Sequence, residues 1–208
     1  DHNATERVLR EAAIRSGALG LAAMPQAAPG QPAGAILHEA KSFGADLVIL
    51  GCYEHSELNL SGPPGLARQV KWGARSDVLI ARTHPPPRDV VVAVDGSSAS
   101  IRAAHRAVAI STRGGCGLNL VHAEEPEARH VDAFEDSVEG LPFKAQALRG
   151  DAKSVVLEWA GQDRADLVVV GTGSPDRMAP WAVGTVSDYM VEHSPSSVFI
   201  AKEIGATS

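Results

Sequence analysis

The chain of 208 residues has few aromatic side chains, no excess of basic residues and no long apolar run. Aromatics make up only 4% of it, so its core has to be built mainly from Val, Ile, Leu and Ala, the residues that line parallel sheets covered by helices. No stretch reaches the length of about 18 apolar residues that a membrane-spanning helix needs. The scarcity of aromatics therefore favours an α/β fold. The absence of a long apolar run means that no membrane-spanning helix is expected in this sequence.

Charge and cysteine content exclude further classes of function. The formal net charge is −6 and no cluster of Lys and Arg is present, which argues against nucleic acid as the main partner. Cys52 and Cys116 lie far apart in no metal-ligand spacing, so neither a disulfide framework nor a zinc site is indicated. The histidines form no metal-binding pair either. A reducing cytoplasm is the location that fits these features.

The sequence contains an internal repeat. Residues 35–51 (AILHEAKSFGADLVILG) align with residues 155–171 (VVLEWAGQDRADLVVVG) at an offset of 120, and seven of the seventeen pairs are identical. The same offset, with no insertion, aligns the apolar run at 78–81 with the run at 198–201. Two unrelated strands would not keep one register over this length, so a duplication is favoured over chance similarity.

The second repeat, residues 85–208, predicts a doubly wound α/β domain. Its short β-branched runs are typical of parallel strands buried on both faces. Ser97 and Asp151 are placed to cap helices. Five strands joined by right-handed helical crossovers are expected, in the sheet order 3-2-1-4-5. The expected strands are 89–95, 118–123, 144–148, 167–170 and 197–201.

The first repeat, residues 1–84, is predicted to be incomplete. A helix is expected at 4–15, but the offset of 120 puts the counterpart of the strand at Asp89 ahead of Asp1. The first two strands and the helix between them are therefore missing, and their loss would leave strand edges unpaired in the middle of the sheet. We expect the missing segment to exist in the natural protein or to be replaced by another chain. Residues 83–89, with three prolines, form the linker.

The last strands of the two repeats, 78–81 and 197–201, are apolar and lie at the open edge of each predicted sheet. Exposed edges of this kind invite pairing. We expect these two strands to pair antiparallel about a pseudo-twofold axis, which would make the chain an intrachain pseudo-dimer. A homodimer is a further assembly that such edges allow.

An open parallel sheet binds ligands beyond the carboxyl ends of its strands, where the strand order reverses. In the second repeat this crevice lies between the first and fourth strands, so Asp95 and Gly171 should face it. Gly171 and Gly184 bracket a loop. Thr185 can cap the helix that follows, with Asp188 as its capping-box partner. A glycine-bracketed loop that ends at a helix N-terminus offers backbone N–H groups to an anion.

This loop resembles that of the nucleotide-binding members of the universal stress protein family, which reads Gly, two residues, Gly, nine residues, then Gly-Ser or Gly-Thr. Gly171, Ser174 and Gly184-Thr185 keep this spacing, with Ser174 in place of the second glycine. The runs VAVDGS at 92–97 and LVHA at 120–123 resemble the family's first and second strands. The resemblance covers all of the second repeat and the first from about residue 4.

The resemblance implies two tandem copies of the adenine nucleotide alpha hydrolase-like fold, with an ATP site, and Mg²⁺ beside the nucleotide, in the second copy. Asp95 would contact the ribose, and Ala123 and Val170 would border the base. Each residue also has a structural explanation, since Asp95 can simply begin a turn and Gly184 can be a bend. The phosphates would be held by Gly171, Ser174, Gly184, Thr185 and Val186.

The first repeat is expected not to bind a nucleotide. Glu54 puts a carboxylate where a phosphate would lie, and Pro64 has no N–H to donate. Gly51 and Gly65 are the other positions that correspond to the loop of the second repeat. Cys52, which follows the strand, is better explained as a structural cysteine than as a redox-sensitive thiol, because no basic neighbour is evident.

The resemblance implies a cytoplasmic stress-response protein that binds a nucleotide and regulates a partner without catalysis. An ATPase or nucleotidyl transferase is one alternative, but no lysine follows the glycine loop as in a P-loop and no nucleophile–base spacing is evident. A regulatory module of a larger protein, such as the cytoplasmic tail of a transporter, is the other, since tandem copies of this domain also occur appended to other proteins.

Overall fold

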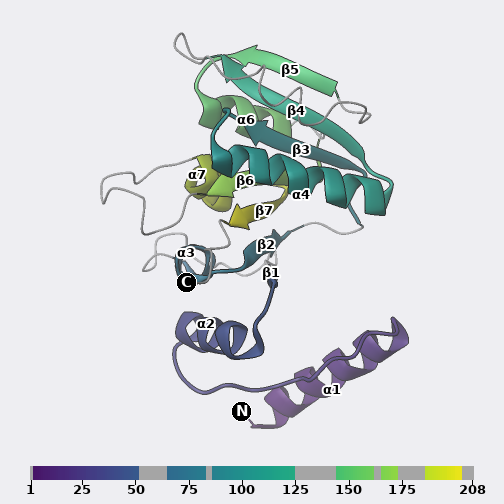
Figure 1. Ribbon diagram of the computed structural model, residues 1–208. Helices are drawn as coiled ribbons and strands as arrows, with labels where there is room; N and C mark the ends of the chain where they lie inside the picture. Colours follow the sequence, from purple (N-terminus) through teal and green to yellow (C-terminus); the bar gives the residue numbers. More distant parts are fainter. Residues whose placement is uncertain are drawn as a thin grey trace.

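The computed structural model describes residues 2–51, 65–82, 86–124, 144–161, 165–172 and 186–202. These residues form one seven-stranded sheet in the order β1-β2-β7-β6-β3-β4-β5 (Figure 1). All neighbouring strands in it are parallel except β2 and β7. The fold is therefore α/β with a mostly parallel sheet. Its strands are β1 (Leu47–Gly51), β2 (Asp77–Ala81), β3 (Asp89–Val94), β4 (Gly117–Glu124), β5 (Lys144–Arg149), β6 (Leu167–Thr172) and β7 (Ser197–Lys202).

Helices cover the sheet on two faces, and alternate strand residues point to each face. On one face, α4 packs the small side chains of Ala103, Ala104 and Ala107 on Val90, Val92 and their neighbours. The other face packs against residues of α2, α3, α6 and α7. The helices are α1 (His2–Ala18), α2 (Pro32–Phe43), α3 (Leu66–Gly73), α4 (Ser98–Gly114), α6 (Ala152–Gly161) and α7 (Val186–His193).

The strands of the second half lie in the order β5-β4-β3-β6-β7, which in chain order reads 3-2-1-4-5. Both helix caps expected there are confirmed. The Ser97 hydroxyl accepts a hydrogen bond from the backbone N–H of Ser100 at 3.2 Å. The Asp151 carboxylate accepts one from the N–H of Ser154 at 3.1 Å. These caps fix where α4 and α6 begin, and so where each helix meets the carboxyl edge of the sheet.

The offset of 120 residues recurs in the boundaries of the elements. Four elements of the first half begin 120 residues before an element of the same type in the second half. This agreement at the level of elements supports the alignment made at the level of residues. The equivalent pairs are α2 and α6, β1 and β6, α3 and α7, and β2 and β7.

The predicted antiparallel pairing of the last strands is confirmed, since β2 and β7 lie side by side. Leu79 pairs with Phe199, which is also its equivalent under the offset. The register is therefore symmetric about this pair, as a pseudo-twofold axis requires. The neighbouring pairs are Val78 with Ile200 and Ile80 with Val198.

Hydrogen bonds at the two ends of this pairing repeat the symmetry. The N–H of Arg82 donates to Ser197 Oγ at 3.0 Å. The N–H of Lys202, the equivalent of Arg82, donates to Asp77 Oδ1 at 2.8 Å. Asp77 is in turn the equivalent of Ser197, so two different side chains perform the same task on the two sides of the axis.

The described part of the first half differs from its counterpart in the second half in two respects. The run 24–29, equivalent to β5, has no regular secondary structure, so the described residues of the first half contain no equivalent of β5. A strand needs a neighbour to pair with, and the equivalent of β4 is missing. β1 is buried on one face only: Val48 is 6% exposed, whereas Leu47 is 37% and Ile49 is 59% exposed. In Figure 1, β1 lies at the edge of the sheet and α1 lies away from it.

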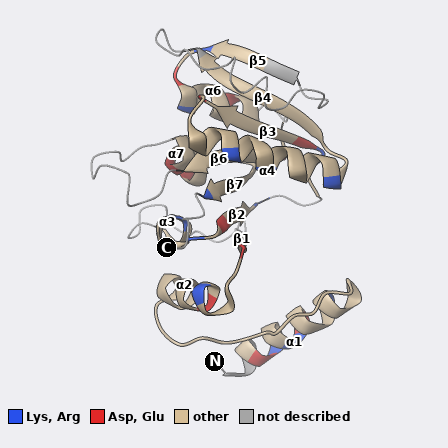
Figure 2. Cartoon of the chain, in the orientation of Figure 1, with Lys and Arg blue, Asp and Glu red and all other residues tan. Residues whose placement is uncertain are grey.

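The surface of the described residues carries charges of both signs. Figure 2 shows Lys and Arg interspersed with Asp and Glu over the helices, without a basic face in that view. No helix among these residues is long and apolar enough to cross a membrane. The linker residues 83–85 and the segment 125–143 lie outside the described residues.

A buried ion pair joins the two halves where α3 meets α7. Lys71 Nζ lies 2.6 Å from Asp188 Oδ1, and the two side chains are 1% and 6% exposed. Burial lowers the pKa of Lys71 although Asp188 raises it. Burial, followed by the charge of Lys71, lowers the pKa of nearby Lys202 to about 8, against the pull of Asp188 and Asp77. Asp188, expected as the capping-box partner of Thr185, thus binds a lysine of the other half, while Thr185 lies outside the described residues.

The pairing of the halves makes Ile80 and Phe199 sensitive positions. Ile80→Lys places a charge at a site that is 1% exposed, and Phe199→Pro removes a donor from a strand that is paired on both sides. Each should lower the free energy of unfolding by about 3 kcal/mol or more, measured by urea denaturation. Ile49→Lys, on the exposed strand β1, is the control and should cost little. Equal costs at Ile49 and Ile80 would contradict this account.

The buried lysine predicts a rise of stability in alkaline solution. Below pH 8 Lys202 is charged in both the folded and the unfolded chain, and burial of this charge destabilises the folded chain. Between about pH 8 and 10.5 the folded chain has lost this proton while the unfolded chain keeps it, so stability increases with pH. Lys202→Met should raise the melting temperature at pH 7 and flatten this increase. Lys41→Met, on the exposed side of α2, should leave the increase unchanged; a wild-type pH profile in Lys202→Met would refute the assignment.

Candidate functional site

A cavity of about 280 Å³ opens at the carboxyl ends of β3, β4 and β6. β3 and β6 are neighbours in the sheet, and the strand order reverses between them. The cavity therefore lies in the crevice that the topology of an open parallel sheet favours for ligands. Five of the eight predicted site residues line it: Asp95, Ala123, Val170, Gly171 and Val186.

The other three predicted site residues, Ser174, Gly184 and Thr185, lie outside the described residues. They belong to the segment between β6 and α7, whose two described ends, at Gly171 and Val186, both reach the cavity. The predicted phosphate loop thus begins and ends at the cavity, and its own contacts stay a prediction. Glu54, Pro64 and Cys52 of the first repeat also lie outside the described residues.

Asp95 occupies a tight turn between β3 and α4. Gly96 has a φ of 78°, a conformation that glycine adopts without strain. The backbone N–H of Ser97 donates to Asp95 Oδ1 at 2.9 Å. Burial raises the pKa of Asp95, but hydrogen bonds from Ser97 and Ser100 outweigh it and hold the pKa below its usual value. Asp95 is therefore an ionised acceptor at the mouth of the cavity.

The first turn of α4 borders the cavity with two serines that the prediction did not include. Ser100 Oγ donates to the carbonyl of Ser97 at 3.0 Å, and the N–H of Asp95 donates to Ser100 Oγ at 3.3 Å. Ser97 and Ser100 thus fix the turn that carries Asp95. The positive end of the helix dipole of α4 also faces this region. The signal in the sequence was the serine-rich run SSAS at 97–100, for which only the helix cap at Ser97 was predicted.

Gly171 has a packing reason to be glycine. A Cβ atom at this position would collide with the backbone of Ala99, at the start of α4. The side of β6 that bears Gly171 therefore has to be bare for α4 to approach it. This packing alone explains why the residue is glycine, whether or not a phosphate binds nearby.

His122 is a further cavity residue, and the prediction placed it in a strand without a role. It is 5% exposed, and its Nδ1 lies 2.9 Å from the carbonyl oxygen of Val94. A carbonyl only accepts, so in the neutral ring Nδ1 carries the proton and Nε2 is the acceptor. The contact ties the end of β3, just before Asp95, to β4. A single polar residue in the apolar run LVHA was the available signal.

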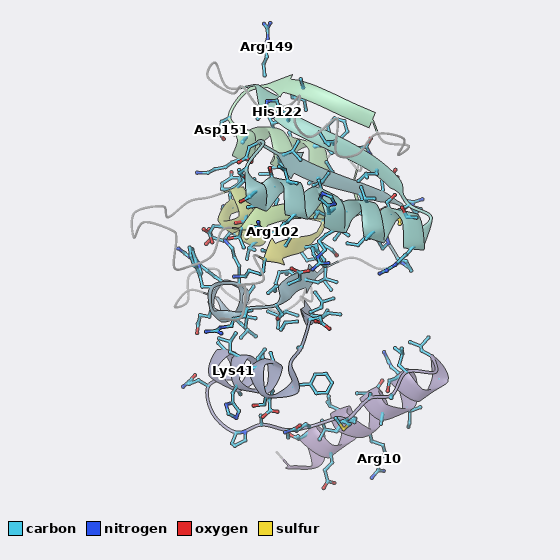
Figure 3. The ribbon with its side chains drawn as sticks, viewed as in Figure 1. Arg10, Lys41, Arg102, His122, Arg149 and Asp151 are labelled. Carbon is cyan, nitrogen blue, oxygen red and sulfur yellow. The ribbon has the colours of Figure 1, made fainter. Side chains whose placement is uncertain are left out.

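The remaining wall of the cavity is apolar, with Ala152 and Val156 of α6 facing the ends of the strands. Sequence alone did not indicate them, since they are ordinary residues of a buried helix face. In Figure 3, Arg149 at the end of β5 extends away from the body of the protein. Asp95 is the one carboxylate among the described lining residues. An apolar cavity with a carboxylate among its lining residues suits a flat ring joined to a group that bears hydroxyls.

Comparison with known sequences gives two matches. Residues 127–202 match the model of the universal stress protein family. A protein from Thermus aquaticus, described as a universal stress protein in the QAH/OAS sulfhydrylase 3′ region, is 27% identical over 135 residues. The match covers 55% of this chain and 98% of the relative.

Several solved structures resemble nearly the whole chain, and two of them serve as examples. A universal stress protein from Archaeoglobus fulgidus has a TM-score of 0.76 at 20% identity, and the match covers 97% of this chain and 77% of that one. A protein of unknown function from Pseudomonas aeruginosa PAO1 has a TM-score of 0.76 at 18% identity, covering 98% and 79%. At these identities the likeness concerns the fold.

The packing of Gly171 gives a direct prediction. Gly171→Ala should lower the free energy of unfolding by about 3 kcal/mol, the upper end of overpacking costs, because the obstacle is backbone and not a flexible side chain. Gly161→Ala is the matched control, since nothing lies within 4 Å of the added Cβ there and the residue ends a helix. Chemical denaturation measures both. A neutral Gly171→Ala would show that α4 does not approach β6 this closely.

Proposed function

Because the chain is a member of the universal stress protein family, we propose that the cavity at the ends of β3, β4 and β6 binds an adenine nucleotide. The observation that carries the proposal is the convergence of Asp95, Ala123 and Gly171, chosen from separate motifs, on one cavity. Binding, and not catalysis, is the activity proposed, in a cytoplasmic protein of the stress response.

The shape and polarity of the cavity suggest how the nucleotide lies. The base packs on the apolar side, between Ala123, Val170 and Val156. The ribose hydroxyls donate to the Asp95 carboxylate, which the low pKa of Asp95 keeps ionised. A cavity of about 280 Å³ is at the lower limit of small-molecule pockets, near 300 Å³, so it suits the nucleoside part. The phosphates then extend outward.

The phosphates in this proposal lie against the loop between β6 and α7. Gly184 and Thr185 offer backbone N–H groups at the start of α7, and Ser174 offers a hydroxyl. ATP with Mg²⁺ is the ligand proposed, because the loop resembles that of the nucleotide-binding members of the family. The described residues contain no group of three or more His, Cys, Asp and Glu side chains that could hold a metal, so the ion would be carried mainly by the phosphates.

A binding role accounts for the polar groups of the cavity better than an enzymatic one. Ser97 and Ser100 bond to each other and to the turn of Asp95, and His122 bonds to the carbonyl of Val94. None of these contacts, among the residues described, pairs a hydroxyl nucleophile with a base. We therefore propose that nucleotide binding changes the conformation or the partner of the protein. A module within a larger regulatory protein would use the site in the same way.

The site is tested by titrating purified protein with ATP, ADP and AMP in a calorimeter. Gly184→Glu should abolish binding by filling the cradle with a carboxylate, and Gly65→Glu, in the first half, should leave it intact. Ser174→Gly should tighten ATP binding about tenfold, worth about 1.4 kcal/mol, if the side chain obstructs a phosphate. Weaker binding in Ser174→Gly would instead make the hydroxyl a phosphate ligand.

Two results would count against this function. Loss of binding in Gly65→Glu equal to that in Gly184→Glu would assign the site to the first half. If none of the three nucleotides binds and denatured protein releases no adenine compound in a mass spectrometer, the proposal is wrong.

A further inference from the structure

The carboxyl end of β7 carries a lysine on the face of the sheet that α3 and α7 cover. Lys202 is the last residue of β7. Val198 and Ile200 of this strand belong to the apolar cluster that also contains residues of α3 and α7. Because side chains alternate along a strand, Lys202 lies on the same face as these two residues. It is 4% exposed, so its ammonium group lies in the interior, where the two halves of the chain meet.

The buried charges around Lys202 leave its ammonium group without a direct ionic partner among the described residues. Lys71, which is 1% exposed, lies 2.6 Å from Asp188 and binds that carboxylate. Asp77, the next buried carboxylate, lies 2.8 Å from Arg106 of α4. Asp77 also accepts from the backbone N–H of Lys202, a contact that does not involve the ammonium group. Within the described ranges, no hydrogen bond or ion pair of Lys202 Nζ is found.

The remaining charges of α3 and α7 do not alter this balance, since Arg68 lies 3.3 Å from Glu192. A buried ammonium group without a counter-ion destabilises the folded chain. Burial and then repulsion by Lys71 accordingly lower the pKa of Lys202 to about 8. An anion that reached Lys202 would remove this destabilisation. The junction of the two halves therefore has the charge that an anion site requires.

The equivalent position in the first half shows how a cation with a structural role is held. Arg82, which aligns with Lys202 at the offset of 120, donates to the carbonyl oxygens of Val191 and Ser196. Its charge is thus bound by the backbone at the end of α7. Lys202 has no such contact in the described part of the chain, so a structural role does not explain why a buried cation ends β7.

This junction lies one strand away from the cavity. Gly171 lines the cavity, and the next residue, Thr172, pairs with Lys202. Neighbouring strands are about 4.8 Å apart. Val186, the first residue of α7, also lines the cavity, and Asp188 follows it in the first turn. The start of α7 therefore connects the cavity with the junction, and the positive end of its dipole favours anions there.

We propose that the ammonium group of Lys202 binds the outermost phosphate of a nucleotide whose base and ribose lie in the cavity. Lys71 adds a second positive charge while it neutralises Asp188. A monophosphate ends close to the cavity, whereas a triphosphate extends past the start of α7 to the junction. Lys202 thus makes the site selective for a nucleoside triphosphate. This inference rests on the proposed function and adds the residue that distinguishes nucleotides by the number of their phosphates.

Lys202→Met tests this selectivity in the full chain. The substitution removes the charge and leaves an apolar side chain in a buried position, so the variant should fold. In a calorimeter at neutral pH, with Mg²⁺ present, it should bind ATP about tenfold more weakly or worse, the factor expected for one charge-assisted hydrogen bond. AMP binding should change by less than about twofold. Lys41→Met, at an exposed position of α2, is the matched control and should bind both nucleotides as wild type does.

Proton uptake gives a second measurement that does not depend on affinity. Near pH 9 most of the unliganded protein has lost the proton of Lys202, whose pKa is about 8. A bound phosphate favours the charged lysine and raises its pKa, so ATP binding should take up about one proton. The phosphates of ATP are already ionised at this pH, so the proton goes to the protein. Titrations in two buffers with different enthalpies of ionisation measure the uptake, and neither AMP binding nor Lys202→Met should show it.

Several outcomes would overturn the role of Lys202. It is wrong if Lys202→Met binds ATP as tightly as wild type, if this variant loses ATP and AMP binding by the same factor, or if ATP binding near pH 9 takes up no proton. Inorganic triphosphate that binds wild type as tightly as ATP would show an anion site that does not serve the nucleotide, and would also overturn it. If neither ATP nor AMP binds wild type, the proposed function itself fails. AMP binding therefore distinguishes the two failures.

Discussion

The antiparallel pairing of β2 with β7 is the contact on which the rest of the molecule depends. The described part of the first half contains two strands, too few to bury a core of its own. By pairing with β7 it extends the sheet of the second half, and Val78 and Ile80 become fully buried. The same pairing removes the open edge of β7, so β6 and β7 sit inside the sheet and hold the carboxyl edge where the cavity opens.

Much of this arrangement follows from local signals in the sequence. Unbroken β-branched runs located β3 and β6, and Ser97 and Asp151 marked the starts of α4 and α6. Asp95 and Gly171 could be brought to one cavity because parallel strands end at the same edge. The pairing of Lys71 with Asp188 could not be foreseen, because it depends on which helix faces meet across the axis. The exposure of β1 could not be foreseen for a similar reason. An apolar sequence indicates that a strand can be buried, but it does not show whether other residues pack on it.

The glycines near the cavity carry less functional information than their spacing suggests. Gly171 is required by the approach of α4, whether or not a phosphate is nearby. The turn at Asp95 is better evidence of a binding site, because a turn with only a structural role does not need a carboxylate at the mouth of an apolar cavity. His122 supports that turn from the neighbouring strand. The polar groups therefore form one connected unit, which makes the position of Asp95 definite before any ligand arrives.

The offset of 120 residues allows each half of the chain to be compared with the other. At this offset, Glu54 and Pro64 of the first loop align with Ser174 and Gly184 of the second, so the loop residues differ. The strand motif that begins at Asp46 and Asp166 is almost the same in the two halves. Exposed edge strands are usually protected by charges, prolines or bulges. β1 has apolar Leu47 and Ile49 at exposed positions instead, so these two side chains give its edge none of that protection.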